Sequence, residues 1–160
     1  MQRVHPELLR PVIPILLAAI ALMMLLKPDL GRAERPARMA PRPFAMGFGF
    51  LLGFYDGFFG PGTGSFWMMA CILARGRDLL GATAHTKVMN LTSNLASLAV
   101  FLAAGQVRFA IGLTMAAGQL AGGWLGAHTA VRGGTRLIRP LFLTMVILLA
   151  AKLAWDAFRP

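Results

Sequence analysis

The sequence predicts an all-α integral membrane protein with about four transmembrane helices and a re-entrant helical hairpin broken by glycines. Three observations support this fold class: 57% of the residues are hydrophobic, only 14% are charged, and the apolar residues form five runs separated by short basic or glycine-containing gaps. A soluble domain usually has about 25% charged residues, so this chain has too little polar surface for water. Its 160 residues leave room for about four or five membrane segments.

The net charge of +10 does not indicate a nucleic-acid partner. A nucleic-acid-binding domain gathers its Lys and Arg on one face, whereas most of them here stand in the gaps between apolar runs. In membrane proteins such gaps carry the positive charge that marks cytoplasmic loops. We therefore expect a multi-pass protein of the bacterial inner membrane, with the lipid bilayer as a partner and no nucleic acid.

The first apolar run, Val12 to Leu26, is expected to form an N-terminal transmembrane helix within residues 1–26. Its length also fits the core of a signal peptide. However, it ends in Lys27-Pro28-Asp29 without a small-x-small cleavage site, which favours a retained short or tilted helix. Residues 27–43 follow as a linker with five Lys or Arg and four prolines, which the positive-inside rule places in the cytoplasm.

The second run, Phe44 to Ala74, is too long for one simple span and is interrupted by Gly60-Pro61-Gly62-Thr63-Gly64. Proline lacks a backbone donor and glycine permits non-helical conformations, so the helix should break there. The next gap, Arg75 to Asp78, is basic again, which places both ends of the run in the cytoplasm. A re-entrant hairpin is therefore favoured over a single broken crossing.

Three further helices are expected from Thr83 to Ala104, from Phe109 to Val131 and from Leu137 to Phe158. Residues 44–160 would then form one unit of a hairpin and three crossings. Because this count of crossings is odd, a preceding copy would be inverted in the membrane, as in inverted-repeat transporters. The chain would thus be half of such a transporter, and the helix within residues 1–26 would be the tail of a missing first repeat.

The glycine-rich break is the first candidate site, because free backbone N–H groups and the start of a helix near Ser65 suit an anion. Its candidate substrate-binding residues are Gly60, Gly62, Thr63, Gly64 and Ser65. Asp56, an acid within an apolar run, is the candidate for proton coupling. Alternatively, the glycines only permit close packing and Asp56 caps a helix end. The absence of a Gly-Lys-Ser/Thr ending excludes a nucleotide-binding loop.

A polar stripe on the helix from Thr83 is the second candidate site. Residues that recur at three- and four-residue spacing share a helix face, and a polar stripe in an apolar span must face protein or water. Thr86, Lys87, Asn90 and Asn94 are its candidate substrate-binding residues, with Lys87 supplying positive charge. Alternatively, the stripe supplies hydrogen bonds between helices, and Lys87 reaches back to the cytoplasmic surface.

Gly118, Gly122 and Gly126 fall four residues apart, a small-xxx-small pattern that lets two membrane helices approach closely. Their expected role is helix packing. No His, Cys or carboxylate pair has metal-ligand spacing, and we expect neither a metal nor another cofactor.

Several strings together resemble the TauE/SafE family of sulfite and organosulfonate exporters, most closely its YfcA-like branch. They are GFYDGFFGPGTGS (Gly53 to Ser65), ATAHTK (Ala82 to Lys87) with Asn90 and Ser93-Asn94, Arg139-Pro140 and Lys152-Leu153. Family members are typically about twice this size and built from two related halves. This chain resembles the C-terminal half only, preceded by the last helix of the first. The resemblance implies movement of small, often sulfur-containing anions, with proton coupling as a candidate mechanism.

The leading hypothesis is a secondary carrier or exporter of small anions, driven by a gradient because no ATP-binding motif is present. Because the chain is about half the length of a typical family member, we expect either that its coding sequence is truncated or that it assembles. It would assemble as a homo-oligomer or with a missing first-half partner. The rival hypothesis is a truncated or accessory membrane component without autonomous transport. An intramembrane enzyme is disfavoured, because Ser65 has no histidine at helical spacing to act as its base.

Overall fold

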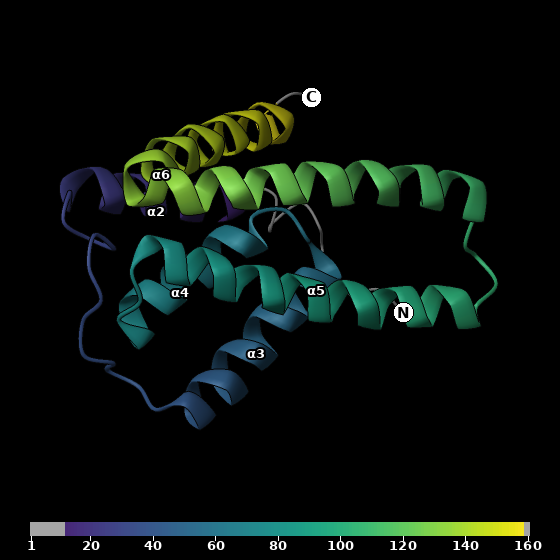
Figure 1. The fold of residues 1–160 in the computed structure, drawn as a ribbon, viewed down its shortest axis with the longest axis horizontal. Helices are drawn as coiled ribbons and strands as arrows, with labels where there is room; N and C mark the ends of the chain where they lie inside the picture. The colour runs from purple at the N-terminus through teal and green to yellow at the C-terminus, as the bar shows by residue number, and fades with distance from the viewer. Residues whose placement is uncertain (1–11, 159–160) are drawn as a thin grey trace.

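The computed structural model describes residues 12–158, and these fold entirely into helices and the loops between them (Figure 1). The helices are α2 (Val12–Leu26), α3 (Pro41–Phe58), α4 (Thr63–Arg75), α5 (Leu79–Ala103) and α6 (Phe109–Phe158). The prediction of an all-helical chain is confirmed for the described residues. The number of membrane crossings and the re-entrant course of α3 and α4 stay predictions.

Local chemistry explains where the helices depart from the predicted boundaries. α3 begins at Pro41 instead of Phe44, because proline has the backbone angle of a first helical turn and needs no N–H partner there. α5 begins at Leu79, four residues before Thr83, because the Asp78 side chain caps it by accepting from the Gly81 amide at 2.8 Å.

The long helix α6 consists of two segments that meet at Gly134, whose backbone angles (φ 53°, ψ −153°) are not helical. The two helices predicted from Phe109 and from Leu137 correspond to these segments, and Figure 1 shows the second doubling back toward the C-terminus. By length and composition, Phe109–Asp156 is the one described helix that passes as a membrane span, with a mean hydropathy of 2.0 in its most apolar window.

The core lies around α4. Trp67, Cys71 and Ile72 are each at most 5% exposed and pack with Phe44 of α3 and Leu79 of α5. A second buried cluster joins α2 to the second segment of α6 through Leu17, Ala21, Val146 and Ala150. Thus α2, α4 and the C-terminal part of α6 form the packed body on which the other helices are placed.

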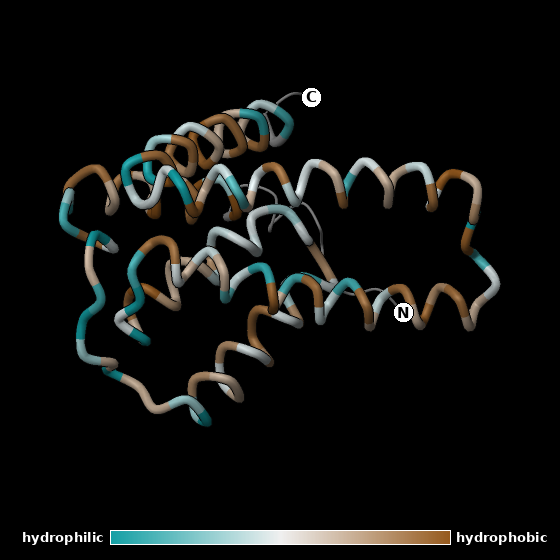
Figure 2. The backbone as a smooth tube through the Cα atoms, in the orientation of Figure 1, coloured by the Kyte–Doolittle hydropathy of each residue, from teal (hydrophilic) through white to brown (hydrophobic). Residues whose placement is uncertain are grey.

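The basic linker of residues 27–43, the basic gap after α4 and the arginine-containing bend between the two segments of α6 lie at one end of the molecule, which we call the loop end (Figures 1 and 2). The linker pairs with the gap after α4, since the amides of Arg35 and Arg38 donate to Gly76 and Ala74 at 2.7 and 3.0 Å. Arg139 of α6 adds a clamp, because its guanidinium donates to backbone carbonyls at the end of α2 and just beyond it. The acceptors are Met24, Lys27, Pro28 and Leu30.

The opposite end of the molecule is a hairpin of two helices with few neighbours. In residues 94–129, which we call the arm, every residue except Val107 is exposed, including many large apolar side chains such as Leu113, Leu120 and Trp124. These side chains need a cover that the described part of the chain does not supply. A lipid bilayer or another protein segment would provide it.

Candidate functional site

The break between α3 and α4 is built by two glycines in left-handed conformations, Gly60 (φ 73°) and Gly62 (φ 89°). An L side chain is strained there. At Gly62 a Cβ would also come within 3.1 Å of Leu17. The Tyr55 hydroxyl donates to Pro61 O at 2.6 Å, so α3 holds the break from the side. The predicted helix break is confirmed at residues 59–62.

Two of the five backbone amides expected to cradle an anion are occupied within the break itself. The Thr63 amide and hydroxyl both donate to Gly60 O, at 3.3 and 2.7 Å, and the Ser65 amide donates to Gly62 O at 2.8 Å. Within residues 12–158 the Gly64 amide donates to no carbonyl outside α4. The Gly60 and Gly62 amides also donate to no carbonyl there, and among these three donors Gly64 is the one inside the first turn of α4, at its positive end.

Gly64 lies directly against α5. A Cβ built on it would stand 3.5 Å from Asn90 Nδ2 and 3.6 Å from Thr86 Cγ2. Both are ordinary van der Waals distances, so an alanine would also fit at this point of contact. The structure thus brings together one member of the predicted cradle and two members of the predicted polar stripe, from segments that are distant in sequence.

Thr86 is the unusual member of this contact. Its side chain is only 6% exposed, yet its hydroxyl has no hydrogen-bond partner in the described part of the chain. Other helical threonines donate to the carbonyl four residues earlier, namely Thr83, Thr92, Thr114 and Thr129. A buried hydroxyl without a partner costs roughly 1–3 kcal/mol, so Thr86 holds an unused donor and acceptor, although its methyl carbon Cγ2 and not its hydroxyl is the atom nearest Gly64.

Asp56 sits in the last turn of α3 and is half-buried. Its Oδ2 atom accepts a hydrogen bond of 2.6 Å from the Ser93 hydroxyl of α5. It therefore ties α3 to α5 and does not cap the end of α3, as the alternative interpretation of the sequence supposed. From the sequence, Ser93 is named only within the strings that resemble the family and is not identified as the partner of Asp56.

Lys87 and Asn94 do not join this contact. Both are exposed in the structure, and neither has a hydrogen bond or ion pair within residues 12–158. One residue along a helix turns the side chain by about 100°, so Lys87 lies on the face beside the one that carries Thr86 and Asn90. The predicted stripe is therefore split between two neighbouring faces of α5.

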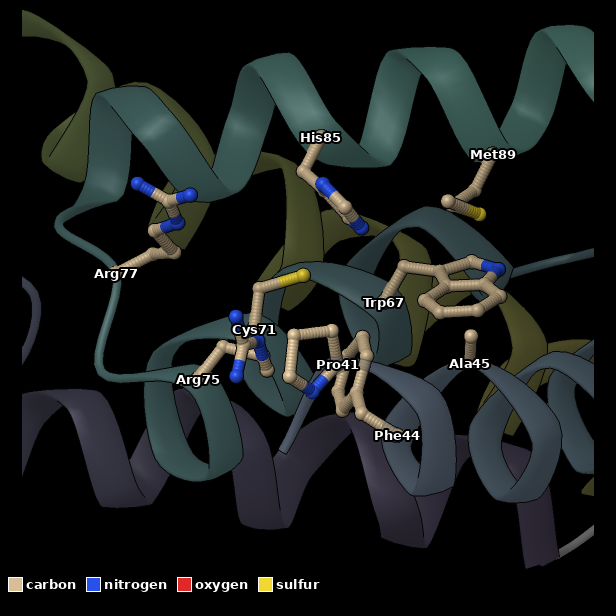
Figure 3. A pocket seen from close by; sticks show the side chains of 9 residues that line it. All are labelled: Pro41, Phe44, Ala45, Trp67, Cys71, Arg75, Arg77, His85 and Met89. Carbon is tan, nitrogen blue, oxygen red and sulfur yellow. The ribbon is translucent and has the colours of Figure 1, made fainter. Parts of the chain in front are cut away.

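A cavity of about 220 Å³ lies between the starts of α3 and α5 and the end of α4, on the loop-end side of this contact, and none of Gly64, Thr86 and Asn90 lines it (Figure 3). Trp67, one turn after Gly64, and Met89, next to Asn90, line its inner part. Arg75 and His85 line it nearer the loop end, and Arg75 also donates to Met39 O at 2.5 Å. The sequence identified Arg75 only as loop charge.

Gly118, Gly122 and Gly126 lie in the arm, and no heavy atom of the described chain comes within 4 Å of a Cβ built on any of them. Their predicted packing role is not tested by contacts within one copy of the chain.

Comparison with known proteins identifies the family. The model of the family described as "Sulfite exporter TauE/SafE" matches residues 1–153. The chain belongs to this family. The resemblance seen in the sequence strings is therefore confirmed, and it extends over nearly the whole chain.

Similar proteins are named as probable membrane transporters. The chain is 42% identical over 156 residues to YfcA of Escherichia coli strain K12, covering 98% of this chain and 58% of that protein. It is 43% identical over 155 residues to a Haemophilus influenzae protein, covering 97% of this chain and 61% of the relative. A Sinorhizobium protein, ORF9, is 42% identical over 154 residues, covering 96% and 59%. The chain thus spans about three fifths of these relatives. No solved structure matches it.

Proposed function

We propose that this chain forms part of a secondary carrier for small anions, with sulfite or an organosulfonate as substrate, in the bacterial inner membrane. The observation that carries the proposal is the contact of Gly64 with Thr86 and Asn90, where a buried hydroxyl and a helix-start amide both lack partners. An anion would accept from the Gly64 amide and would gain from the positive end of α4. It would also accept from the Thr86 hydroxyl once that side chain rotates to turn its hydroxyl, in place of its methyl group, toward Gly64. The family description, sulfite exporter, supports the choice of substrate.

The anion would reach this contact through the cavity at the loop end. Arg75 and Arg77 line that cavity together with Trp67 and His85, so positive charge stands at the approach and apolar surface further in. A basic approach raises the local concentration of anions. The loop end would face the cytoplasm, because it gathers the Lys and Arg of three gaps.

Asp56 would couple transport to protons through its bond to Ser93. An ionised carboxylate accepts the Ser93 hydroxyl in a short charge-assisted hydrogen bond, whereas a protonated one loses the charge. Proton binding would thus loosen the tie between α3, which ends at the break, and α5, which carries Thr86 and Asn90. This gives the break two states that respond to pH.

Lys87 and Asn94 would complete the site only if a second segment covered their face of α5. The chain spans 58% of the length of the E. coli relative, and its arm is uncovered. We assign that cover to a second copy of the chain or to a separate first-half partner. The same observations favour the second candidate function, an accessory component that does not transport alone.

Efflux of radiolabelled sulfite from proteoliposomes tests the proposal. Asn90→Leu, which removes the amide beside Gly64, should lower sulfite affinity about fivefold or more, as loss of a hydrogen bond of about 1 kcal/mol does. Lys87→Gln should lower affinity only where the α5 face is covered, by roughly 1–3 kcal/mol for a charge-assisted bond. If Asn90→Leu binds sulfite as the parent does, the proposed site is wrong. If the chain transports only with an added partner, the accessory function holds.

The proton step has its own pair of variants. Asp56→Asn should flatten the pH dependence of efflux while leaving sulfite binding nearly intact, because the acid is lost without a change in volume. Ser93→Ala removes the tie but keeps the acid, so it should also flatten the pH dependence of efflux, because protonation of Asp56 then breaks no bond to α5. A full pH profile in Asp56→Asn would place proton coupling elsewhere.

A further inference from the structure

An open apolar groove of about 490 Å³ lies between α2, α3 and α4. Ile20 and Met23 line it from α2, Leu52 from α3, and Met69 and Leu73 from α4. No residue of α5 lines it, so it is separate from the anion site proposed above. In a membrane protein such a groove is filled either by a lipid chain or by another helix.

The groove ends at a cluster of arginines. A small cavity of about 40 Å³, lined by Arg35, Arg38 and Arg77, shares Leu73 with the groove. Ala74, which also lines the groove, accepts from the Arg38 amide at 3.0 Å. The apolar groove and the arginine-lined cavity are therefore adjoining parts of one surface.

The positive charge of this cavity is only partly compensated. Arg77 pairs with Glu34 at 2.9 Å, and Arg35 donates to Asp29 O at 3.4 Å. The Arg38 guanidinium has no ion pair or hydrogen bond within residues 12–158. The cavity thus presents an uncompensated cation where the groove ends.

We propose that this surface binds an anionic phospholipid, with an acyl chain in the groove and the phosphate at Arg38. Basic pockets on the cytoplasmic side of membrane helices recognise such headgroups. The groove runs along α2 from Leu16 to Met23, about 10 Å at 1.5 Å per residue. That length fits within one leaflet, about half of a 30 Å hydrocarbon core, and falls short of a crossing helix.

The test uses the full chain purified in detergent. Binding of dioleoylphosphatidylglycerol, dioleoylphosphatidylcholine and inorganic phosphate is measured by native mass spectrometry and by the shift in Tm. The parent should retain the anionic lipid and be stabilised by it, and should respond much less to phosphatidylcholine or phosphate alone. Equal effects of the two lipids, or an equal effect of free phosphate, would overturn the proposal.

Two pairs of variants locate the site. Arg38→Gln should weaken phosphatidylglycerol binding about fivefold, whereas Arg32→Gln, in the same linker but paired with Asp29 at 3.0 Å, should leave it nearly unchanged. Ala19→Trp, at an exposed position that lines the groove, should block the acyl chain. Ala18→Trp, its exposed neighbour outside the groove, should not.

Equal effects of the two arginine variants would indicate non-specific attraction and contradict the site. Unchanged lipid binding in Ala19→Trp would also contradict it. A cysteine at Ala19, in a Cys71→Ser background, that crosslinks to a second copy of the chain would show a protein helix in the groove instead.

Discussion

The molecule has two glycine-rich regions that use the same residue in opposite ways. In the break and at the end of α4, Gly60, Gly62 and Gly76 have positive φ angles, and a Cβ on Gly76 would come within 2.1 Å of Arg35 O. In the arm, Gly122 and Gly126 have helical angles and no neighbour within 4 Å. The first set shapes the backbone of the packed body, whereas the second leaves room for something outside the chain.

The body is therefore stabilised by contacts within the chain, whereas the arm needs contacts with its surroundings. The body around α4 satisfies its own turns through short bonds such as Thr63 to Gly60 at 2.7 Å, and its core is closed by Trp67 and Leu79. The arm is exposed almost throughout. Substitutions in the body should therefore affect folding, and substitutions in the arm should affect assembly.

The largest effect is expected from Gly76→Ala. A Cβ there meets the backbone of Arg35 and adopts an unfavourable left-handed conformation (φ 64°), so unfolding free energy should fall by roughly 3–5 kcal/mol. Gly126→Ala, the matched change in the arm, should stay within about 0.5 kcal/mol. Denaturation in mixed detergent micelles measures both. Similar losses of unfolding free energy in the two variants would contradict the proposed difference between the body and the arm.

A smaller loss is expected from Arg139→Gln, which weakens the clamp on the carbonyls that follow α2. Hydrogen bonds from a charged donor contribute roughly 1.5–3 kcal/mol, so the variant should lose about 2 kcal/mol. Arg136→Gln, an exposed position one turn earlier in α6, is the control and should change stability little. If both variants lose the same free energy of unfolding, the loss comes from the change in net charge, and the Arg139 hydrogen bonds do not stabilise the fold.

The smallest effect should come from Gly122→Leu, which fills the small-residue face of the arm. Crosslinking in native membranes should trap dimers or larger species of the parent, and the variant should weaken them by about 1 kcal/mol. Ala117→Leu, on the opposite face of the same helix and also exposed, should leave assembly unchanged. A strictly monomeric protein that still transports anions would contradict this role of the arm.

The sequence predicted the helices and their break because both depend on local chemistry: apolar runs of membrane length, and a Gly-Pro-Gly-Thr-Gly string that cannot stay helical. It did not separate Thr86 and Asn90 from Lys87 and Asn94. A spacing of three and four residues covers two adjacent helix faces, and only the packing of Gly64 on α5 selects one of them.

Contacts between segments that are distant along the chain could not be predicted from the sequence either. In the sequence Arg139 stands out only as part of the Arg139-Pro140 string, yet it bonds carbonyls more than 100 residues earlier. The Asp56 to Ser93 bond joins a predicted site residue to a serine with no predicted role, and their partnership depends on how α3 packs beside α5. Such pairs follow from tertiary packing, which one sequence does not encode as a visible pattern.

The most direct test of the anion site is sulfite binding by Thr86→Val, measured by isothermal titration calorimetry beside denaturation in mixed micelles. Valine keeps the shape of threonine and removes the unpartnered hydroxyl, so affinity should fall about fivefold while stability is unchanged or rises. Thr92→Val removes a hydroxyl that already bonds Val88 O at 2.9 Å and should leave affinity unchanged. A Thr86→Val protein that binds sulfite as tightly as the parent would contradict an anion site at the contact of α4 and α5.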